Sequence, residues 1–190
     1  MKVFLVSTPI GEQKLGEMFE KLYEELEKLG YQHISDFITL SSEEFTKEMS
    51  KGKDAQKEFY NKMVNNIRQA DICIFEASTP SFGVGYLIQE SLSNSKPTIV
   101  LFYKEMKSFF IPGIDDDKLF VKTYDESSYK KVLKSVVNIA REKRDKRFNF
   151  FLSPKLLNYL EQASNARGVT KSKLLRDMIV QHMRENASAE

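Results

Sequence analysis

Short apolar runs separated by amphipathic stretches constrain the fold of this chain more than any other feature. Five of these runs have the length of a buried strand and lie at residues 2–6, 31–40, 71–76, 97–103 and 119–124. The stretches between them carry apolar residues at helical spacing, at residues 15–29, 56–69, 86–94 and 127–145. Strands that alternate with helices form a parallel sheet with helices on both faces. We therefore predict an α/β domain with a five-stranded parallel sheet over residues 1–145.

Composition excludes several classes of protein. With 190 residues, of which 41% are hydrophobic, 8 are Gly and 5 are Pro, the chain is neither collagen-like nor disordered. A single cysteine, Cys73, cannot close an intrachain disulfide, and with two distant histidines, His33 and His182, it cannot form a zinc site of the usual spacing. The apolar run at residues 3–6 is too short for a signal peptide or a membrane span. We expect a cytoplasmic protein with no membrane segment, no metal and no other cofactor.

Charge is distributed unevenly along the chain. Residues 141–190 hold 11 Lys and Arg against 6 Asp and Glu, a net charge of +5, and residues 1–140 carry −3. In this basic tail, residues 147–152 alternate as a short strand, and two short helices follow on either side of Gly168. One strand and two short helices bury little apolar surface alone. We predict that residues 146–190 form a separate module that dimerises or packs on the first domain.

Three loops are candidates for a binding site, because ligands of an open parallel sheet bind beyond the carboxyl ends of its strands. They are residues 7–11, residues 76–85 and the segment after Tyr103. The second loop is the richest, since it carries three hydroxyl side chains and two glycines immediately before a predicted helix. Free backbone N–H groups at a helix N-terminus favour a phosphate or a carboxylate. A tight turn that binds no ligand has the same composition.

The glycines of this loop fit no common nucleotide-binding fingerprint. Gly83-Val84-Gly85 lacks the third glycine of a dinucleotide-binding loop, and no Lys-Ser or Lys-Thr follows it as in a P-loop. The sequence therefore gives no support for an NAD or ATP site.

A longer motif includes these glycines. Residues 70–86 read ADICIFEASTPSFGVGY, and Lys96-Pro97 follows them. This pattern resembles the nucleoside 2-deoxyribosyltransferase superfamily, and within it the 2′-deoxynucleoside 5′-monophosphate N-hydrolases, over residues 1–140. The resemblance implies a flavodoxin-like sheet, a deoxynucleotide ligand with its phosphate near Ser81, and a homodimer. The candidate nucleotide- and phosphate-binding residues are Ser7, Thr8, Gly11, Ser78, Ser81, Gly83 and Gly85.

Two positions depart from this family's pattern. The resemblance implies a catalytic glutamate directly after Gly-Val-Gly-Tyr and a second acid eight residues before Asp71, and this chain has Leu87 and Met63 there. Cleavage of an N-glycosidic bond needs a carboxylate beside the anomeric carbon and a second group that positions the sugar or water. Leucine and methionine supply neither. Glu90, one helical turn after Leu87, and Glu76, at the end of a strand, are the catalytic candidates if a displaced carboxylate acts.

The basic tail has a strand, a helix, the turn Gly168-Val169-Thr170 and a second helix, and this order resembles the ribbon-helix-helix family of dimeric DNA-binding proteins. The resemblance implies that two strands pair in a ribbon that enters the major groove, while the second helix binds backbone phosphate. The implied DNA-binding residues are Arg147, Asn149, Phe151, Thr170, Lys171 and Lys173. Phe151 is unusual because its outward position is generally polar. It either contacts a thymine methyl group or marks a module that only dimerises.

Three functions fit these residues. We favour a regulatory DNA-binding protein whose first domain binds a nucleotide without cleaving it. The alternative is an active enzyme, either a nucleoside 2-deoxyribosyltransferase or a deoxynucleoside monophosphate N-glycosidase, with a relocated carboxylate. In this case the basic tail serves only for dimerisation. A nucleotide-binding effector that acts through a protein partner is the third.

Overall fold

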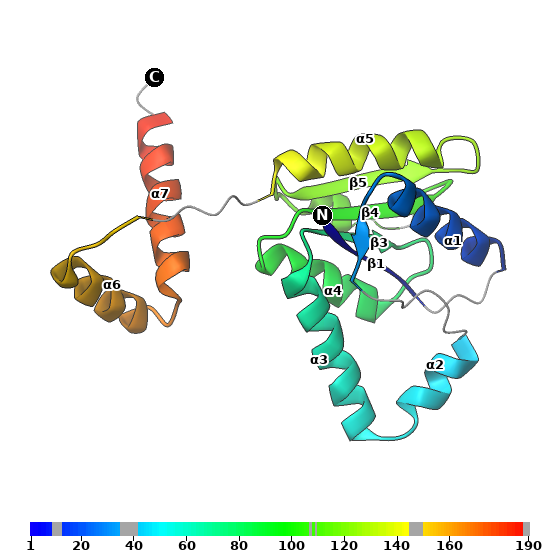
Figure 1. The fold of residues 1–190 in the computed structure, drawn as a ribbon, viewed down its shortest axis with the longest axis horizontal. Helices are drawn as coiled ribbons and strands as arrows, with labels where there is room; N and C mark the ends of the chain where they lie inside the picture. Colours follow the sequence, from blue (N-terminus) through cyan, green and yellow to red (C-terminus); the bar gives the residue numbers. More distant parts are fainter. Residues whose placement is uncertain (9–12, 35–41, 107, 109, 145–149, 188–190) are drawn as a thin grey trace. The chain divides into compact units, whose positions relative to one another are not determined.

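Two compact units make up the chain, Met1–Asp145 and Lys146–Glu190. We call them the α/β unit and the C-terminal unit. The computed structural model describes residues 1–8, 13–34, 42–106, 108, 110–144 and 150–187 (Figure 1).

Five parallel strands form the sheet of the α/β unit, in the order β2-β1-β3-β4-β5. They are β1 (Lys2–Ser7), β2 (Gln32–His33), β3 (Ile72–Glu76), β4 (Thr98–Tyr103) and β5 (Leu119–Tyr124). The central strands β3 and β4 are buried along their whole length, as expected for strands covered on both faces. The strand order is that of flavodoxin-like folds, with a switch point between β1 and β3. The structure confirms the predicted α/β fold and its parallel sheet.

Helices cover both faces of this sheet (Figure 1). The helices of the α/β unit are α1 (Gln13–Lys28), α2 (Ser42–Met49), α3 (Lys53–Gln69), α4 (Phe82–Ser93) and α5 (Tyr129–Glu142), with a short 3-10 turn at Ile111–Gly113. α1 and α5 pack on one face, and α3 and α4 pack on the other. Each face of the sheet has its own hydrophobic core, and successive strand residues point to opposite faces. Val3 packs with α1 and α5, whereas Phe4 packs with α3 and α4.

The region between α1 and α3 differs from the prediction. The strand expected at residues 31–40 is limited to Gln32–His33, and residues 35–41 lie outside the described part. This strand lies at the edge of the sheet, where it pairs with β1, and short strands are common at sheet edges. Residues 42–49, for which the sequence pattern gives no strand or helix, form the helix α2.

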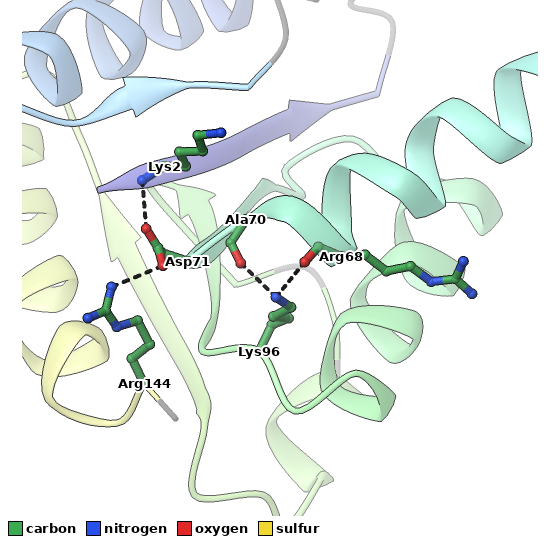
Figure 2. A network of polar contacts seen from close by, with 6 residues as sticks. All are labelled: Lys2, Arg68, Ala70, Asp71, Lys96 and Arg144. Carbon is green, nitrogen blue, oxygen red and sulfur yellow. Dashed lines mark hydrogen bonds and ion pairs between the residues drawn. The ribbon is translucent and has the colours of Figure 1, made fainter. Parts of the chain in front are cut away.

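A polar network joins the amino ends of β1 and β3 (Figure 2). The backbone N–H of Lys2 donates to Asp71 Oδ2 at 2.8 Å, and Arg144 Nη1 lies 3.0 Å from Asp71 Oδ1. Lys96 Nζ donates to two backbone carbonyl groups at the end of α3, each at 2.8 Å. Partial burial opposes ionisation of Asp71, but the Lys2 N–H and the Arg144 guanidinium outweigh it and lower the pKa of this carboxyl. The network therefore stabilises the end of the sheet opposite to the carboxyl ends of the strands.

Two helices form the described part of the C-terminal unit, α6 (Pro154–Ala166) and α7 (Lys171–Ala187). Ser153 caps α6, and Gly168, with a φ of +63°, allows the turn into α7. Residues 150–152, predicted to end a strand, are not in a strand, and residues 147–149 lie outside the described part. A two-stranded ribbon needs a second strand as hydrogen-bond partner, and one copy of the chain supplies only one.

Most large apolar side chains of the C-terminal unit are exposed. Leu160 and Leu174 are its buried hydrophobic residues in the described part. The exposed ones are Phe150, Phe151, Leu156, Leu157, Tyr159, Met178, Ile179, Val180 and Met183. None of the helices described for this chain is long and apolar enough to cross a membrane.

Candidate functional site

The loop between β3 and α4 lies at the carboxyl edge of the sheet. Ser81 caps α4, because its Oγ accepts a hydrogen bond from the N–H of Val84 at 3.3 Å. This cap starts the helix at Phe82, four residues before the predicted start at Tyr86. The first turn of α4 therefore has free backbone N–H groups at the edge where ligands of this fold bind.

The end of β1 is joined to this loop. Thr8 Oγ1 donates to Thr79 O at 3.1 Å, and Ser7 Oγ donates to Thr8 O at 3.0 Å. Two of the predicted binding residues, Ser7 and Thr8, thus lie beside the β3–α4 loop. Gly11, a third predicted residue, lies outside the described part of the chain.

A pocket of about 590 Å³ opens at this edge, on the face covered by α3 and α4. Its lining residues are Ala77, Thr79, Pro80, Ser81, Phe82, Val84, Gly85, Tyr86, Ile88, Phe102, Ser108, Phe110 and Ile111. This volume suits a ligand the size of a nucleotide. Ser108 and Phe110 belong to the segment after Tyr103, which the sequence marks as a candidate loop.

The lining is apolar, and it includes exposed aromatic rings. Among the described residues that line the pocket there is no Asp, Glu, Lys or Arg, and the polar side chains are hydroxyl groups. Phe82 and Phe110 are almost fully exposed to solvent, at 102% and 90%. Exposed aromatic faces beside a pocket of this size can stack on a planar ring such as a nucleobase.

Not all predicted phosphate ligands face this pocket. Ser81 and Gly85 line it, and Gly83 lies between them in the first turn of α4. Ser78 is buried elsewhere, where its hydroxyl donates to Glu76 and accepts from the backbone N–H of Tyr103 at 2.6 Å. Its hydrogen-bonding capacity is therefore used inside the protein.

Leu87 and Met63 lie in the apolar core between the sheet and the helices α3 and α4. Met63 is 2% exposed and Leu87 is 8% exposed. Both side chains contribute to packing at the positions where the resemblance implies catalytic acids.

Glu76, the first of the two catalytic candidates, is turned away from the pocket. It ends β3, and the strand alternation puts it on the face of Ile72 and Ile74, which packs against α1 and α5. Its carboxyl group accepts hydrogen bonds from the hydroxyl and the N–H of Ser78, the latter at 3.3 Å, and from Tyr124 Oη at 3.2 Å. Burial and the Glu76 carboxyl both raise the pKa of Tyr124. Glu76 is therefore part of a buried hydrogen-bond network.

Glu90, the second candidate, lies on α4 one helical turn beyond Leu87. Its Oε1 accepts a hydrogen bond from Asn94 Nδ2 at 3.0 Å, and it is not among the residues that line the pocket. Glu90 nevertheless lies near the hydroxyl group of Tyr86, which lines the pocket, so it borders the pocket without lining it. Within the described residues, no group of three or more His, Cys, Asp and Glu could hold a metal ion.

The predicted DNA-binding residues of the C-terminal unit are described in part. Arg147 and Asn149 lie outside the described residues, and Phe151 is fully exposed. Thr170 Oγ1 accepts a hydrogen bond from the N–H of Lys173 at 3.2 Å and so caps α7. Lys171 and Lys173 are exposed at the start of this helix, each within 3.5 Å of a carboxylate of its own unit.

Comparison with known proteins supports part of the sequence interpretation. No family model matches the chain. A relative from Thermofilum pendens, named "Putative 2′-deoxynucleoside 5′-phosphate N-hydrolase 1", is 29% identical over 109 residues, 55% of this chain and 70% of the relative. A relative of the same name from Methanosarcina mazei is 26% identical over 136 residues, 71% of this chain and 80% of the relative. These relatives support the resemblance of this chain to the nucleoside 2-deoxyribosyltransferase/N-glycosidase superfamily.

A solved structure supports the fold of the α/β unit. A 2-deoxyribosyltransferase from Bacillus psychrosaccharolyticus matches with a TM-score of 0.50 at 16% identity, over 70% of this chain and 90% of that one. The ribbon-helix-helix likeness of the C-terminal unit and its binding to DNA find no support in these comparisons.

Proposed function

We propose that the α/β unit binds a 2′-deoxynucleoside 5′-phosphate and does not cleave its N-glycosidic bond. The observation that carries this proposal is the lining of the pocket, which among the described residues contains no carboxylate. The ligand class comes from the names of the relatives. The volume of the pocket, the exposed rings of Phe82 and Phe110 and the capped start of α4 are consistent with that class.

We infer the absence of N-glycosidic cleavage from the positions of the acidic residues. An oxocarbenium-like transition state needs a carboxylate as nucleophile or as base for water on the face of the sugar. Leu87 and Met63 are buried hydrocarbon and thioether groups, which supply neither a carboxylate nucleophile nor a base for water. Glu76 faces the opposite core, and Glu90 is bonded to Asn94. Ground-state binding needs none of these groups.

The phosphate is expected at the start of α4. The first-turn N–H groups and the helix dipole favour an anion there, and the Ser81 hydroxyl lines the same part of the pocket. Gly83 and Gly85 carry no side chains that would obstruct an approaching phosphate. Ser78 does not belong to this set, because its hydroxyl is bonded inside the core.

Calorimetry with the four 2′-deoxynucleoside 5′-monophosphates tests the proposal. Ser81→Ala removes a hydroxyl at the expected phosphate position and should weaken binding by about tenfold, on the scale of a hydrogen bond to a charged group. Ser153→Ala is the matched control, because it removes the cap of α6 in the C-terminal unit and should leave affinity unchanged. Wild-type affinity in Ser81→Ala, or no binding of any of the four nucleotides to the wild type, would refute the proposal.

We further propose that residues 146–190 pair with a second copy of the chain and that the paired module contacts duplex DNA as part of a regulatory function. The exposed apolar residues of α6 and α7 favour a partner for this unit. Its eight Lys and Arg against four Asp and Glu give a charge of +4, which favours a polyanion. The capped start of α7 beside Lys171 and Lys173 is suited to a backbone phosphate.

Salt dependence of DNA binding tests this second proposal. Lys171→Ala with Lys173→Ala should weaken binding to duplex DNA and lower the slope of log K against log salt by about 1.8, if both amines contact phosphate. Lys131→Ala with Lys134→Ala on α5 makes the same charge change in the α/β unit and should alter neither. An unchanged slope in the first variant, or a monomer at micromolar concentration in sedimentation experiments, would contradict the proposal.

A further inference from the structure

Two tyrosines from different helices meet beside the pocket. Tyr60 lies on α3 and Tyr86 on α4, and their hydroxyl oxygens are 2.9 Å apart. Their ring centroids are 6.0 Å apart with an angle of 43° between the planes, and each residue is 47% exposed. The pair is therefore accessible to a ligand, and the hydrogen bond fixes the two rings relative to each other.

This pair adjoins both positions at which the carboxylates are missing. Tyr60 is one helical turn before Met63, and Tyr86 directly precedes Leu87. Tyr86 lines the pocket and is the one titratable residue among the described residues that do so. The helices α3 and α4 thus bring two hydroxyl groups to this side of the pocket, and the carboxyl group of Glu90 on α4 lies near the hydroxyl of Tyr86.

We propose that the Tyr60–Tyr86 hydroxyl pair binds the 3′-hydroxyl of the nucleotide and selects ligands that carry it. This inference rests on the proposed nucleotide binding. A 2′-deoxynucleoside 5′-phosphate has a single free hydroxyl on its sugar, and a phenol can both donate and accept one hydrogen bond. When one tyrosine donates to the other, the pair can still accept a hydrogen bond from the ligand hydroxyl, and the bonds polarise each other.

The pair acts as a neutral group. The hydrogen bond with Tyr60, partial burial and the nearby Glu90 carboxylate raise the pKa of Tyr86 to about 12. The phenol of Tyr86 therefore keeps its proton at neutral pH and does not act as a nucleophile toward the sugar. It supplies hydrogen bonds without the charge that cleavage would require.

Binding of two matched nucleotides to three proteins tests the inference. A 2′-deoxynucleoside 5′-monophosphate and its 2′,3′-dideoxy analogue differ only in the 3′-hydroxyl, and calorimetry gives the ratio of their dissociation constants. We expect the wild type to prefer the 2′-deoxy ligand by about 3- to 10-fold, on the scale of a neutral hydrogen bond. Tyr60→Phe and Tyr86→Phe, which keep both rings, should each bring this ratio close to one.

The control is Tyr159→Phe, which removes an exposed phenol from the C-terminal unit and should keep the wild-type ratio. An unchanged ratio in Tyr60→Phe and Tyr86→Phe, in a wild type that binds nucleotide, would overturn the role of the pair and leave the proposed function intact. No binding of either nucleotide to the wild type would overturn both. Thermal melting of each variant distinguishes a loss of the hydroxyl from a loss of folding.

Discussion

Glu76 gives the sharpest contrast between a structural and a catalytic carboxyl group. Glu76→Gln keeps the volume of the side chain but replaces one acceptor oxygen by an N–H₂ donor. The carboxyl group accepts from the hydroxyl and N–H of Ser78 and from Tyr124 Oη, all in a buried environment. The variant loses at least one of these bonds and sets two donors against each other, so we expect a loss of about 2–4 kcal/mol of unfolding free energy.

Urea denaturation followed by circular dichroism measures this loss. Glu90→Gln is the comparison, because Glu90 is partly exposed on α4, where it accepts from Asn94 and lies near Tyr86, so its loss should stay below about 1 kcal/mol. Glu76→Gln should not change the affinity for nucleotide, since Glu76 does not line the pocket. Wild-type stability of Glu76→Gln together with altered ligand binding would refute the structural role.

Two further predictions concern individual groups. Burial raises the pKa of the Cys73 thiol to about 12, so a thiol reagent at about pH 8 should label the protein only after denaturation, and rapid labelling of the folded protein would contradict the core position. The hydroxyl groups and backbone N–H groups of Ser127 and Ser128 lower the pKa of Asp125 from 3.8 to about 2. Its stabilising contribution is therefore complete above pH 3.8 and is lost as the pH falls toward 2. Asp125→Asn should flatten the pH dependence of stability in this range, and an equally steep decline in both proteins would count against these hydrogen bonds.

Most of the fold could be predicted because the signals are local. The strands β3 and β4 are apolar runs whose burial follows from composition alone, and the helices between the strands show helical spacing. β2 lies within the strand predicted at residues 31–40 but is shorter, since Gln32 and His33 are polar and their pairing with β1 depends on position at the sheet edge. The strand predicted at residues 147–152 stays a prediction for residues 147–149, which lie outside the described part, and its hydrogen bonds would come from a second chain.

The site could be predicted only in part because its contacts are distant in sequence. The loop with Ser81 can be predicted, because its glycines and hydroxyl groups all lie within ten residues before a helix. The bond between Glu76 and Tyr124 spans 48 positions, and that between Tyr60 and Tyr86 spans 26. No local pattern indicates either pairing. The sequence therefore indicates Glu76 as a catalytic candidate. In the structure, its carboxyl group accepts hydrogen bonds from Ser78 and Tyr124 inside the core.

Release of free base is the most direct test of binding without cleavage. The purified protein is incubated at high concentration with each of the four 2′-deoxynucleoside 5′-monophosphates and the corresponding nucleosides, and the products are separated by chromatography. An active deoxynucleotide N-hydrolase serves as the positive control. We predict no free base above the level without protein, for ligands that calorimetry shows to bind. Base release that exceeds this level and is lost in Glu90→Gln or Glu76→Gln would contradict the account and identify a displaced catalytic carboxylate.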